Sequence, residues 1–208
     1  MSFRRFALAI ALGLSMLFAG CGRATPVSTP TPTREPTHKI LLAFGDRFID
    51  DIYTTVRPAL EGAGYKVIVA SSVLIPRHGK ETELEVQPDL LLTDVYVGDY
   101  DAIVFTCDND IATGGGRPET DRIAQQAVEQ GKVLAAICNG PLVLGYARVV
   151  KGVKVTSHPA TTCGRLQTTF GAVCTNAAVE RDGLIITARD RYASQAFAEA
   201  VLEALQDR

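Results

Sequence analysis

From His38 onward, short apolar runs alternate with amphipathic stretches of the chain. The apolar runs predict buried strands at residues 39–44, 66–71, 102–106, 133–137 and 153–156. The amphipathic stretches predict helices at residues 50–63, 118–130, 141–147 and 194–205. Because such alternation is typical of βαβ units, the pattern predicts an α/β fold with a mostly parallel sheet.

Two parts of the domain depart from this alternation. Residues 178–187 predict a β-hairpin, because Asp182-Gly183 is a favoured turn sequence between two apolar runs. Residues 77–97 carry the weakest pattern, which leaves their structure open apart from a short strand near residues 90–92. The sequence contains no internal repeat, so residues 38–208 are expected to form one domain.

Composition narrows the classes of protein and partner. Of the 208 residues, 47% are hydrophobic and the formal net charge is -2, which is typical of one globular domain with a sizeable core. The 21 basic side chains form no run that would bind nucleic acid, so we expect no nucleic-acid partner. The sequence has no Gly-rich phosphate loop, haem motif or convincing metal cluster, so we expect neither a cofactor nor a metal.

Residues 1–21 resemble the export signal of a bacterial lipoprotein. An arginine pair precedes an apolar stretch at residues 6–18 that is too short for a comfortable membrane span. Residues 17–21 read Leu-Phe-Ala-Gly-Cys, which looks like a lipobox in which Cys21 receives the lipid. The alternative is an ordinary signal peptide with an incidental cysteine. With lipid at Cys21, we expect the chain to be anchored to a membrane of the cell envelope on its non-cytoplasmic side.

Residues 22–37 are rich in threonine, proline and serine and poor in apolar side chains. Alternating prolines such as Pro30 and Pro32 favour extended chain that does not pack into a core. We expect this segment to be a tether that holds the domain of residues 38–208 away from the bilayer.

The richest chemistry lies where the predicted strand at residues 133–137 ends. This strand runs into Cys138, and Gly140 and Pro141 permit an abrupt turn into the next helix. The N–H groups at a helix start favour a thiolate, which makes a cysteine there a better nucleophile or redox sensor. Carboxyl ends of parallel strands are also where open α/β sheets build their sites. The alternative is a buried structural cysteine.

Residues 136–141, Ala-Ile-Cys-Asn-Gly-Pro, resemble the elbow of the ThiJ/PfpI family, part of the class I glutamine-amidotransferase-like superfamily. The resemblance covers about residues 39–205 and includes Val-Thr-Ser-His-Pro at residues 155–159. It implies a flavodoxin-like three-layer sandwich, a homodimer and a nucleophilic Cys138. Family members are variously glyoxalases or deglycases that act on reactive carbonyls, peptidases, chaperones and oxidation sensors, so the fold alone names no substrate.

The chain departs from the family pattern in two places. The family usually has a glutamate that contacts the elbow cysteine, but Ile52 stands at that position here. Asp51 could reach the sulfur if its helix began one residue out of register; alternatively, Asp50 and Asp51 only cap the helix and interact with its dipole. Where the family has Gly-Gly for an oxyanion site, this chain has Asp108, with three glycines displaced to residues 114–116.

Further residues complete the predicted site. His158 coincides with a histidine near the cysteine of some family members and is the best candidate general base; otherwise it is a loop residue. Asn139, Gly140 and Asp108 are the candidate substrate-binding residues. Asn139 stands where many peptidase-like members have histidine, and its amide cannot shuttle protons.

The remaining cysteines suit an exported protein. Cys163 and Cys174 could close a short disulfide loop if their Cα atoms come within about 7 Å of each other. Cys107 is another possible disulfide partner, including for Cys138; alternatively it is a buried spectator.

Functions of different classes follow from these residues. In the first, the Cys138 thiolate adds to the carbonyl carbon of a small ligand while His158 or an aspartate moves the proton. In the second, catalysis has been lost with the family glutamate, and the protein is a redox-sensing or ligand-binding lipoprotein. A purely structural envelope protein is the third. The sequence slightly favours cysteine chemistry on a small molecule that it does not identify.

Overall fold

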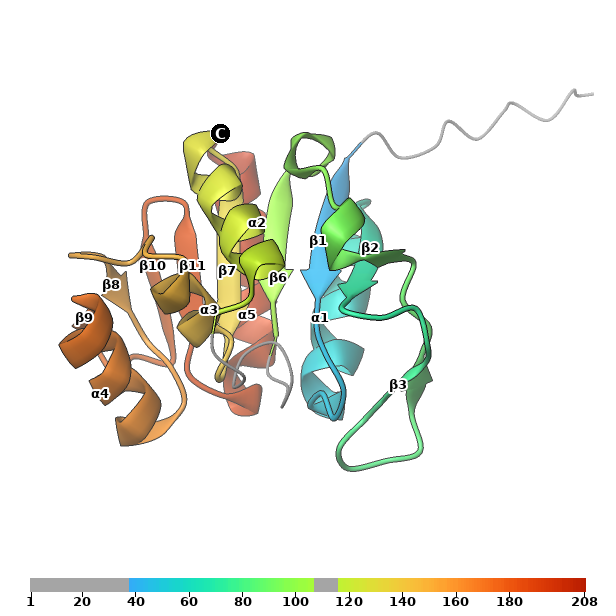
Figure 1. Ribbon diagram of the computed structural model, residues 1–208, viewed down its shortest axis with the longest axis horizontal. Coiled ribbons are helices and arrows are strands. Elements are labelled where there is room, and N and C mark those ends of the chain that lie inside the picture. Colours follow the sequence, from blue (N-terminus) through green and yellow to red (C-terminus); the bar gives the residue numbers. More distant parts are fainter. Residues whose placement is uncertain (1–37, 107–115) are drawn as a thin grey trace, which may run out of the picture. The chain divides into compact units, whose positions relative to one another are not determined.

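The structure is a computed structural model that describes residues 38–106 and 116–208. Seven strands of the described residues form the central sheet: β1 (Lys39–Ala43), β2 (Lys66–Ser71), β5 (Leu90–Leu91), β6 (Ala102–Phe105), β7 (Val133–Ile137), β10 (Val179–Asp182) and β11 (Ile185–Ala188). Their order is β10-β11-β7-β6-β1-β2-β5 (Figure 1). All neighbours run parallel except β10 and β11, which form an antiparallel hairpin. The predicted mostly parallel sheet is therefore confirmed.

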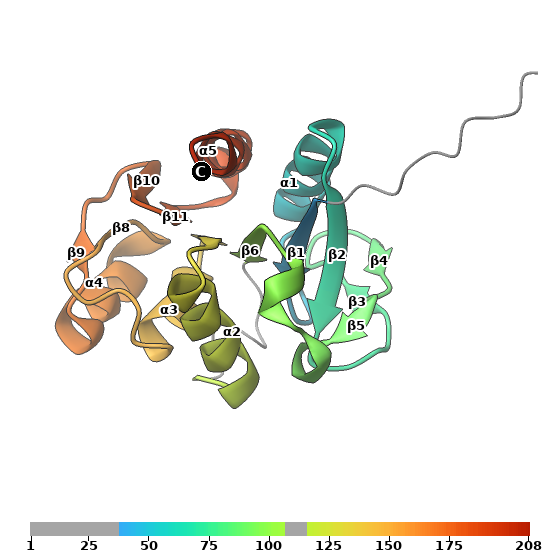
Figure 2. The same cartoon turned by 90° about the horizontal axis from the view of Figure 1, so that it is seen from above.

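Helices cover both faces of this sheet, as the view from above shows (Figure 2). One face carries α1 (Asp50–Gly62) and α5 (Ser194–Gln206). The other carries α2 (Pro118–Glu129) and α3 (Pro141–Tyr146), and α4 (Pro159–Phe170) packs beyond α3. This arrangement is the expected three-layer sandwich.

Burial of the strands on both faces explains why they appear in the sequence as apolar runs rather than as alternating patterns. In β1, Ile40 and Leu42 join the apolar cluster under α1 and α5, whereas Leu41 and Ala43 join the cluster under α2 and α3. All four residues are fully buried. Successive side chains of a strand point to opposite faces, so one short strand contributes to both cores.

The predicted strand at residues 153–156 differs from expectation. Only β8 (Lys154–Val155) forms there, and it pairs with β9 (Val173–Cys174) in a separate two-stranded sheet. The Thr156 N–H donates to the side-chain oxygen of Thr187 on β11 at 2.9 Å. In a strand of the central sheet, such an N–H would instead donate to a backbone carbonyl of the neighbouring strand. This segment therefore lies beside the central sheet without extending it.

Residues 77–97 contain more structure than their pattern predicts. β3 (Arg77–His78) pairs antiparallel with β4 (Glu85–Val86), and β5 falls within the expected range of residues 90–92. Short 3-10 turns at Leu92–Asp94 and Val97–Asp99 then lead into β6.

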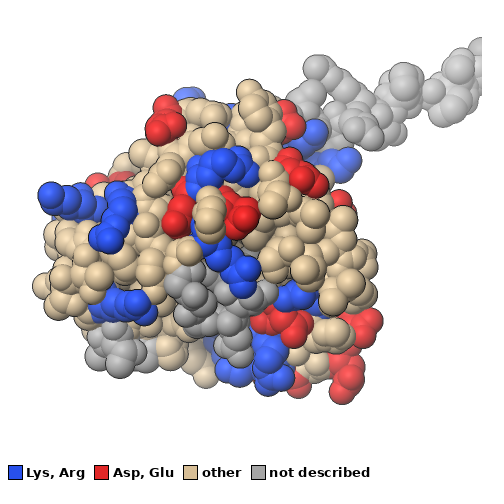
Figure 3. Space-filling view, in the orientation of Figure 1, with Lys and Arg blue, Asp and Glu red and all other residues tan. Residues whose placement is uncertain are grey.

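The outer surface of the described residues carries charges of both signs. Lys and Arg side chains are interspersed with Asp and Glu on the face shown in Figure 3, as the nearly neutral composition leads one to expect. Within residues 38–106 and 116–208, no helix is both long and apolar enough to cross a bilayer.

Candidate functional site

Cys138 lies directly after β7, where the chain turns into α3. Its φ of 65° is in the left-handed region, which a non-glycine residue adopts at a cost on the order of 1 kcal/mol or more. Neighbouring segments hold it there. The Cys138 N–H donates to the Ala188 carbonyl at 2.9 Å, and its own carbonyl accepts from the His158 N–H at 3.0 Å and the Ser157 hydroxyl at 2.5 Å.

Gly140 makes the turn after Cys138 possible. Its N–H donates to the Ile137 carbonyl at 2.9 Å, so the backbone folds back tightly on the end of β7. A Cβ atom at this position would lie 2.6 Å from the Phe105 carbonyl oxygen and 2.9 Å from that of Ile137. The structure therefore places Gly140, a predicted substrate-binding residue, where the close approach of two backbone segments requires glycine.

Cys138 is only 7% exposed and lines a pocket of about 240 Å³. We call it the cysteine pocket, and its lining residues are Ile49, Lys80, Cys138, Asn139, His158, Asp190, Arg191 and Tyr192. Cys138, His158 and Asn139, all predicted from the sequence, thus meet at one place. The Asn139 side-chain oxygen accepts from the Thr162 hydroxyl at 3.2 Å, which fixes the orientation of its amide.

His158 connects the cysteine to the next helix. It precedes α4 as the N-cap residue and has an exposed side chain that lines the cysteine pocket. Its backbone N–H donates to the Cys138 carbonyl at 3.0 Å, which holds the main chain of His158 next to that of Cys138. This placement makes His158 available for proton transfer to a ligand held in the pocket.

Ile52 occupies the position at which the family usually has its glutamate. It is fully buried and belongs to the same apolar cluster as Cys138. Asp51 points elsewhere: its side chain is 65% exposed, and its carboxylate pairs with Arg191 at 3.3 Å. The prediction of Asp51 as a catalytic carboxylate finds no support in this geometry, because α1 begins in the register that turns Ile52 inward.

Asp50 holds one wall of the cysteine pocket. It is 4% exposed, and its carboxylate accepts hydrogen bonds from the Glu81 N–H at 3.0 Å and from the Thr82 hydroxyl. These contacts fasten the loop that carries Lys80 to the start of α1. Burial acts to raise the pKa of Asp50, but the bonds from Thr82 and Glu81 prevail and lower it from 3.8 to about 2.

We expect Asp50→Asn to lower the free energy of unfolding at neutral pH by roughly 2 kcal/mol. Because the folded-state pKa lies below the unfolded-state value, the wild-type advantage should be complete above about pH 4 and should disappear between about pH 4 and pH 2. Urea unfolding of both chains across this range measures it. An advantage that did not change with pH would show that the Asp50 carboxylate is not the stabilising group.

Several residues of the cysteine pocket are missing from the sequence-based prediction. Arg191 pairs with both Asp51 and Glu81, the latter at 3.1 Å, and so connects the segment after β11 to α1. The Asp190 carboxylate accepts from the Tyr192 N–H at 2.9 Å. Tyr192 is 89% exposed at the rim. One signal could have found them: they follow β11, a parallel neighbour of β7, so they end at the same edge of the sheet as Cys138.

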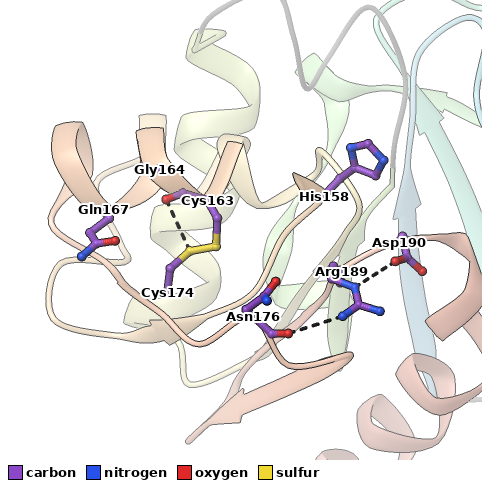
Figure 4. A pocket seen from close by; sticks show the side chains of 8 residues that line it. All are labelled: His158, Cys163, Gly164, Gln167, Cys174, Asn176, Arg189 and Asp190. Atoms are coloured by element: carbon purple, nitrogen blue, oxygen red, sulfur yellow. Dashed lines mark hydrogen bonds and ion pairs between the residues drawn. A yellow bond between two sulfur atoms is a disulfide. The ribbon is translucent and has the colours of Figure 1, made fainter. Parts of the chain in front are cut away.

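A second and larger cavity, of about 590 Å³, adjoins the first (Figure 4). We call it the disulfide cavity, and its lining residues are His158, Cys163, Gly164, Gln167, Cys174, Asn176, Arg189 and Asp190. Cys163 on α4 and Cys174 on β9 form a disulfide there, with their Cα atoms 5.9 Å apart. The two cavities share His158 and Asp190.

Replacing both disulfide cysteines, as Cys163→Ser/Cys174→Ser, should lower the free energy of unfolding by about 3 kcal/mol, because the unfolded chain regains the freedom of an 11-residue loop. Chemical denaturation measures the loss. As an internal control, a reductant should destabilise the wild-type chain and leave the double variant unchanged. Equal stabilities of the two chains without reductant would contradict the expected contribution.

Three predicted site residues lie outside the described residues. These are the proposed lipidation site Cys21, the possible disulfide partner Cys107 and the candidate substrate-binding Asp108. Their roles stay predictions.

Proteins of a known family resemble this chain in sequence. The sequence model of the DJ-1/PfpI family matches residues 38–204. A deglycase named PfpI, from Pyrococcus furiosus, is 33% identical over 130 residues, which are 58% of this chain and 72% of that protein.

Solved structures show the same fold. A protein from Anabaena variabilis with DJ-1/ThiJ/PfpI-like and ferritin-like domains superposes with a TM-score of 0.75 at 28% identity, over 81% of this chain and 48% of that one. The chain thus spans about half of that two-domain protein. A ThiJ/PfpI domain protein from Brachyspira murdochii gives a TM-score of 0.75 at 23% identity, over 84% and 99% of the two chains.

Proposed function

Because the chain belongs to the DJ-1/PfpI family, we propose that it uses Cys138 to react with small reactive carbonyl compounds. The main support is the geometry of Cys138: its backbone is held in a left-handed conformation at the carboxyl end of β7, and the residue lines a pocket together with His158. The relative from Pyrococcus furiosus is named a deglycase, which supports the choice of carbonyl chemistry. The pocket of about 240 Å³ has room for a ligand as small as methylglyoxal.

The proposed first step is addition of the Cys138 thiolate to the aldehyde carbon. A sulfur–carbon bond forms, the π electrons of the carbonyl move to its oxygen, and this oxygen takes a proton from His158 to give a hemithioacetal. For methylglyoxal, internal proton transfer then oxidises the aldehyde carbon and reduces the ketone carbon. Hydrolysis of the resulting thioester releases lactate, so water is the only co-reactant.

The test is the consumption of methylglyoxal by the full chain, followed by proton NMR together with the formation of lactate. We expect consumption by the wild-type chain, and none above the buffer rate for Cys138→Ser or for chain alkylated at Cys138 by iodoacetamide. Equal rates for the wild-type chain and Cys138→Ser would refute the proposal.

A second candidate is a non-catalytic redox sensor or ligand-binding protein, and the observation in its favour is Ile52. Without the family glutamate beside the sulfur, proton transfer loses one of its expected carriers. In this function, hydrogen peroxide oxidises the Cys138 thiolate to a sulfenic acid and is itself reduced to water. One equivalent of oxidation at Cys138, with no turnover of methylglyoxal, would favour this candidate.

We also propose that lipid on Cys21 anchors the protein to a membrane of the cell envelope on its non-cytoplasmic side. The support is the lipobox-like sequence before the Thr/Pro-rich segment. Partition of the exported full chain into the detergent phase should be lost in Cys21→Ser. The family resemblance further implies a homodimer, which sedimentation of the full chain in detergent would test.

A further inference from the structure

Arg189 stands beside Cys138 at the edge of the sheet. The parallel register of β7 and β11 pairs Ile137 with Ala188, and the Cys138 N–H donates to the Ala188 carbonyl at 2.9 Å. Arg189, the next residue after β11, is therefore next to Cys138, because neighbouring strands lie about 4.8 Å apart. Arg189 lines the disulfide cavity, whereas Cys138 lines the cysteine pocket.

The guanidinium group of Arg189 is held in one orientation (Figure 4). Its Nε donates to an Asp190 carboxylate oxygen at 2.9 Å, and its Nη1 donates to the Asn176 carbonyl at 3.4 Å. The Tyr192 N–H in turn fixes the Asp190 carboxylate. Within the part of the chain that the structure describes, Nη2 has no hydrogen-bond partner, so an oriented donor is left for a ligand.

The rest of the disulfide cavity offers several polar side chains and has a size suited to a ligand. Gln167 on α4 and Asn176 after β9 contribute side-chain amides, and the disulfide fixes these two segments to each other. A volume of about 590 Å³ lies within the usual range for small-molecule sites. The two cavities share His158 and Asp190 among their lining residues, so a ligand that spanned both would meet Cys138 in one and Arg189 in the other.

We propose that the disulfide cavity binds the carboxylate of a carbonyl substrate whose reactive carbon lies at Cys138, with Arg189 as the binding residue. This inference rests on the proposed function and names its substrate class: aldehydes or ketoaldehydes that carry a carboxylate some atoms away. With Nε and Nη1 bound to Asp190 and Asn176, Nη2 of Arg189 offers a charged, directed donor of the kind that binds a carboxylate oxygen. Because Asp190 offsets the charge of Arg189, selection comes from this directed donor rather than from an excess of positive charge.

Two alkylating reagents of nearly equal shape test the inference on the full chain. N-iodoacetyl-β-alanine carries a carboxylate and its amide derivative does not; both lose iodide as the Cys138 sulfur forms its bond to carbon. Peptide mass spectrometry gives each rate at Cys138, and 2-mercaptoethanol gives the intrinsic ratio of the reagents. We expect wild-type Cys138 to favour the carboxylate reagent by about tenfold over that ratio, as one charge-assisted hydrogen bond would provide.

Arg189→Gln should bring the preference back to the intrinsic ratio. Arg181→Gln is the matched control, since Arg181 also pairs with an aspartate, Asp207 at 2.8 Å, but lines neither cavity. In this variant, the preference of Cys138 for the carboxylate reagent should stay at the wild-type value. Gln167→Glu is a second variant that leaves the contacts of Arg189 intact. It places a negative charge in the cavity, which repels the carboxylate of the reagent, and it should also abolish the preference.

The outcomes separate the two proposals. Reaction of Cys138 with the neutral reagent, but no preference for the carboxylate reagent, would overturn the carboxylate site and leave the proposed function standing. If neither reagent modifies Cys138, the proposed function fails. Titration of Cys138→Ser with succinate then decides the site: NMR shifts of the Asn176 and Gln167 side-chain amides that Arg189→Gln abolishes would support it, and unshifted signals would overturn it.

Discussion

Methylglyoxal turnover is expected to rise about a hundredfold when Ile52 is replaced by glutamate, the low end of what a positioned acid or base contributes. Ile52 is fully buried in the apolar cluster that contains Cys138, and the family resemblance places at this position the glutamate that contacts the cysteine. Burial raises the pKa of a carboxyl group, which brings it closer to the value at which it can both accept and donate a proton near neutral pH. Initial rates of lactate formation against pH measure the effect.

The control for Ile52→Glu is Ile52→Gln, which has the same shape and cannot ionise. Both changes bury a polar group and should destabilise the fold to a similar extent, so circular dichroism must first show that both chains are folded at the assay temperature. Only the glutamate variant should gain turnover. Equal rates for the two variants would mean that the missing carboxylate does not limit the reaction.

Gly140→Ala should lower the free energy of unfolding by about 3 kcal/mol, at the upper end of typical overpacking costs. The added methyl group would lie 2.6 Å from the Phe105 carbonyl oxygen and 2.9 Å from the Ile137 carbonyl oxygen. Both are backbone atoms of buried strands, so neither can move aside by changing a rotamer. Urea denaturation measures the loss, and the melting temperature should fall by about 2–4 °C for each kcal/mol.

The matched control for Gly140→Ala is Gly164→Ala in α4. A Cβ atom at Gly164 meets nothing within 4 Å, and alanine is a better helix former than glycine by about 1 kcal/mol. This variant should therefore be as stable as the wild-type chain or more so. If Gly140→Ala were equally stable, β6 and β7 would have to separate more easily than their packing indicates.

The sequence predicted the elements whose pattern is strong. The strands of the central sheet are buried on both faces, so each is a compact apolar run, and α5 has apolar positions at helical spacing. By contrast, α4 contains threonines and Gly164 and has a weakly amphipathic sequence, and it is stabilised by packing on α3 and by a disulfide. Such tertiary contacts are not visible in a local window, which is why this helix was not predicted.

The residues of the site that are neighbours in the chain could be predicted from the sequence, whereas those brought together by the fold could not. Cys138, Asn139 and Gly140 are neighbours in the chain, so one short motif predicted their positions. Lys80 comes from a loop that Asp50 and the Phe48 carbonyl hold against the start of α1. Arg191 follows the last strand of the sheet. Nothing in either local sequence indicates the site; the order of the strands brings these segments together.

The bond between Cys163 and Cys174 makes the larger cavity dependent on where the protein is produced. Recombinant chain made in a reducing cytoplasm would carry two thiols in its place, and the wall formed by α4 and β9 would no longer be held by a covalent link. A preparation could then be folded, keep an intact Cys138, and still give misleading results for any ligand longer than methylglyoxal. Production through an oxidising compartment is therefore a condition for studying the specificity of this protein.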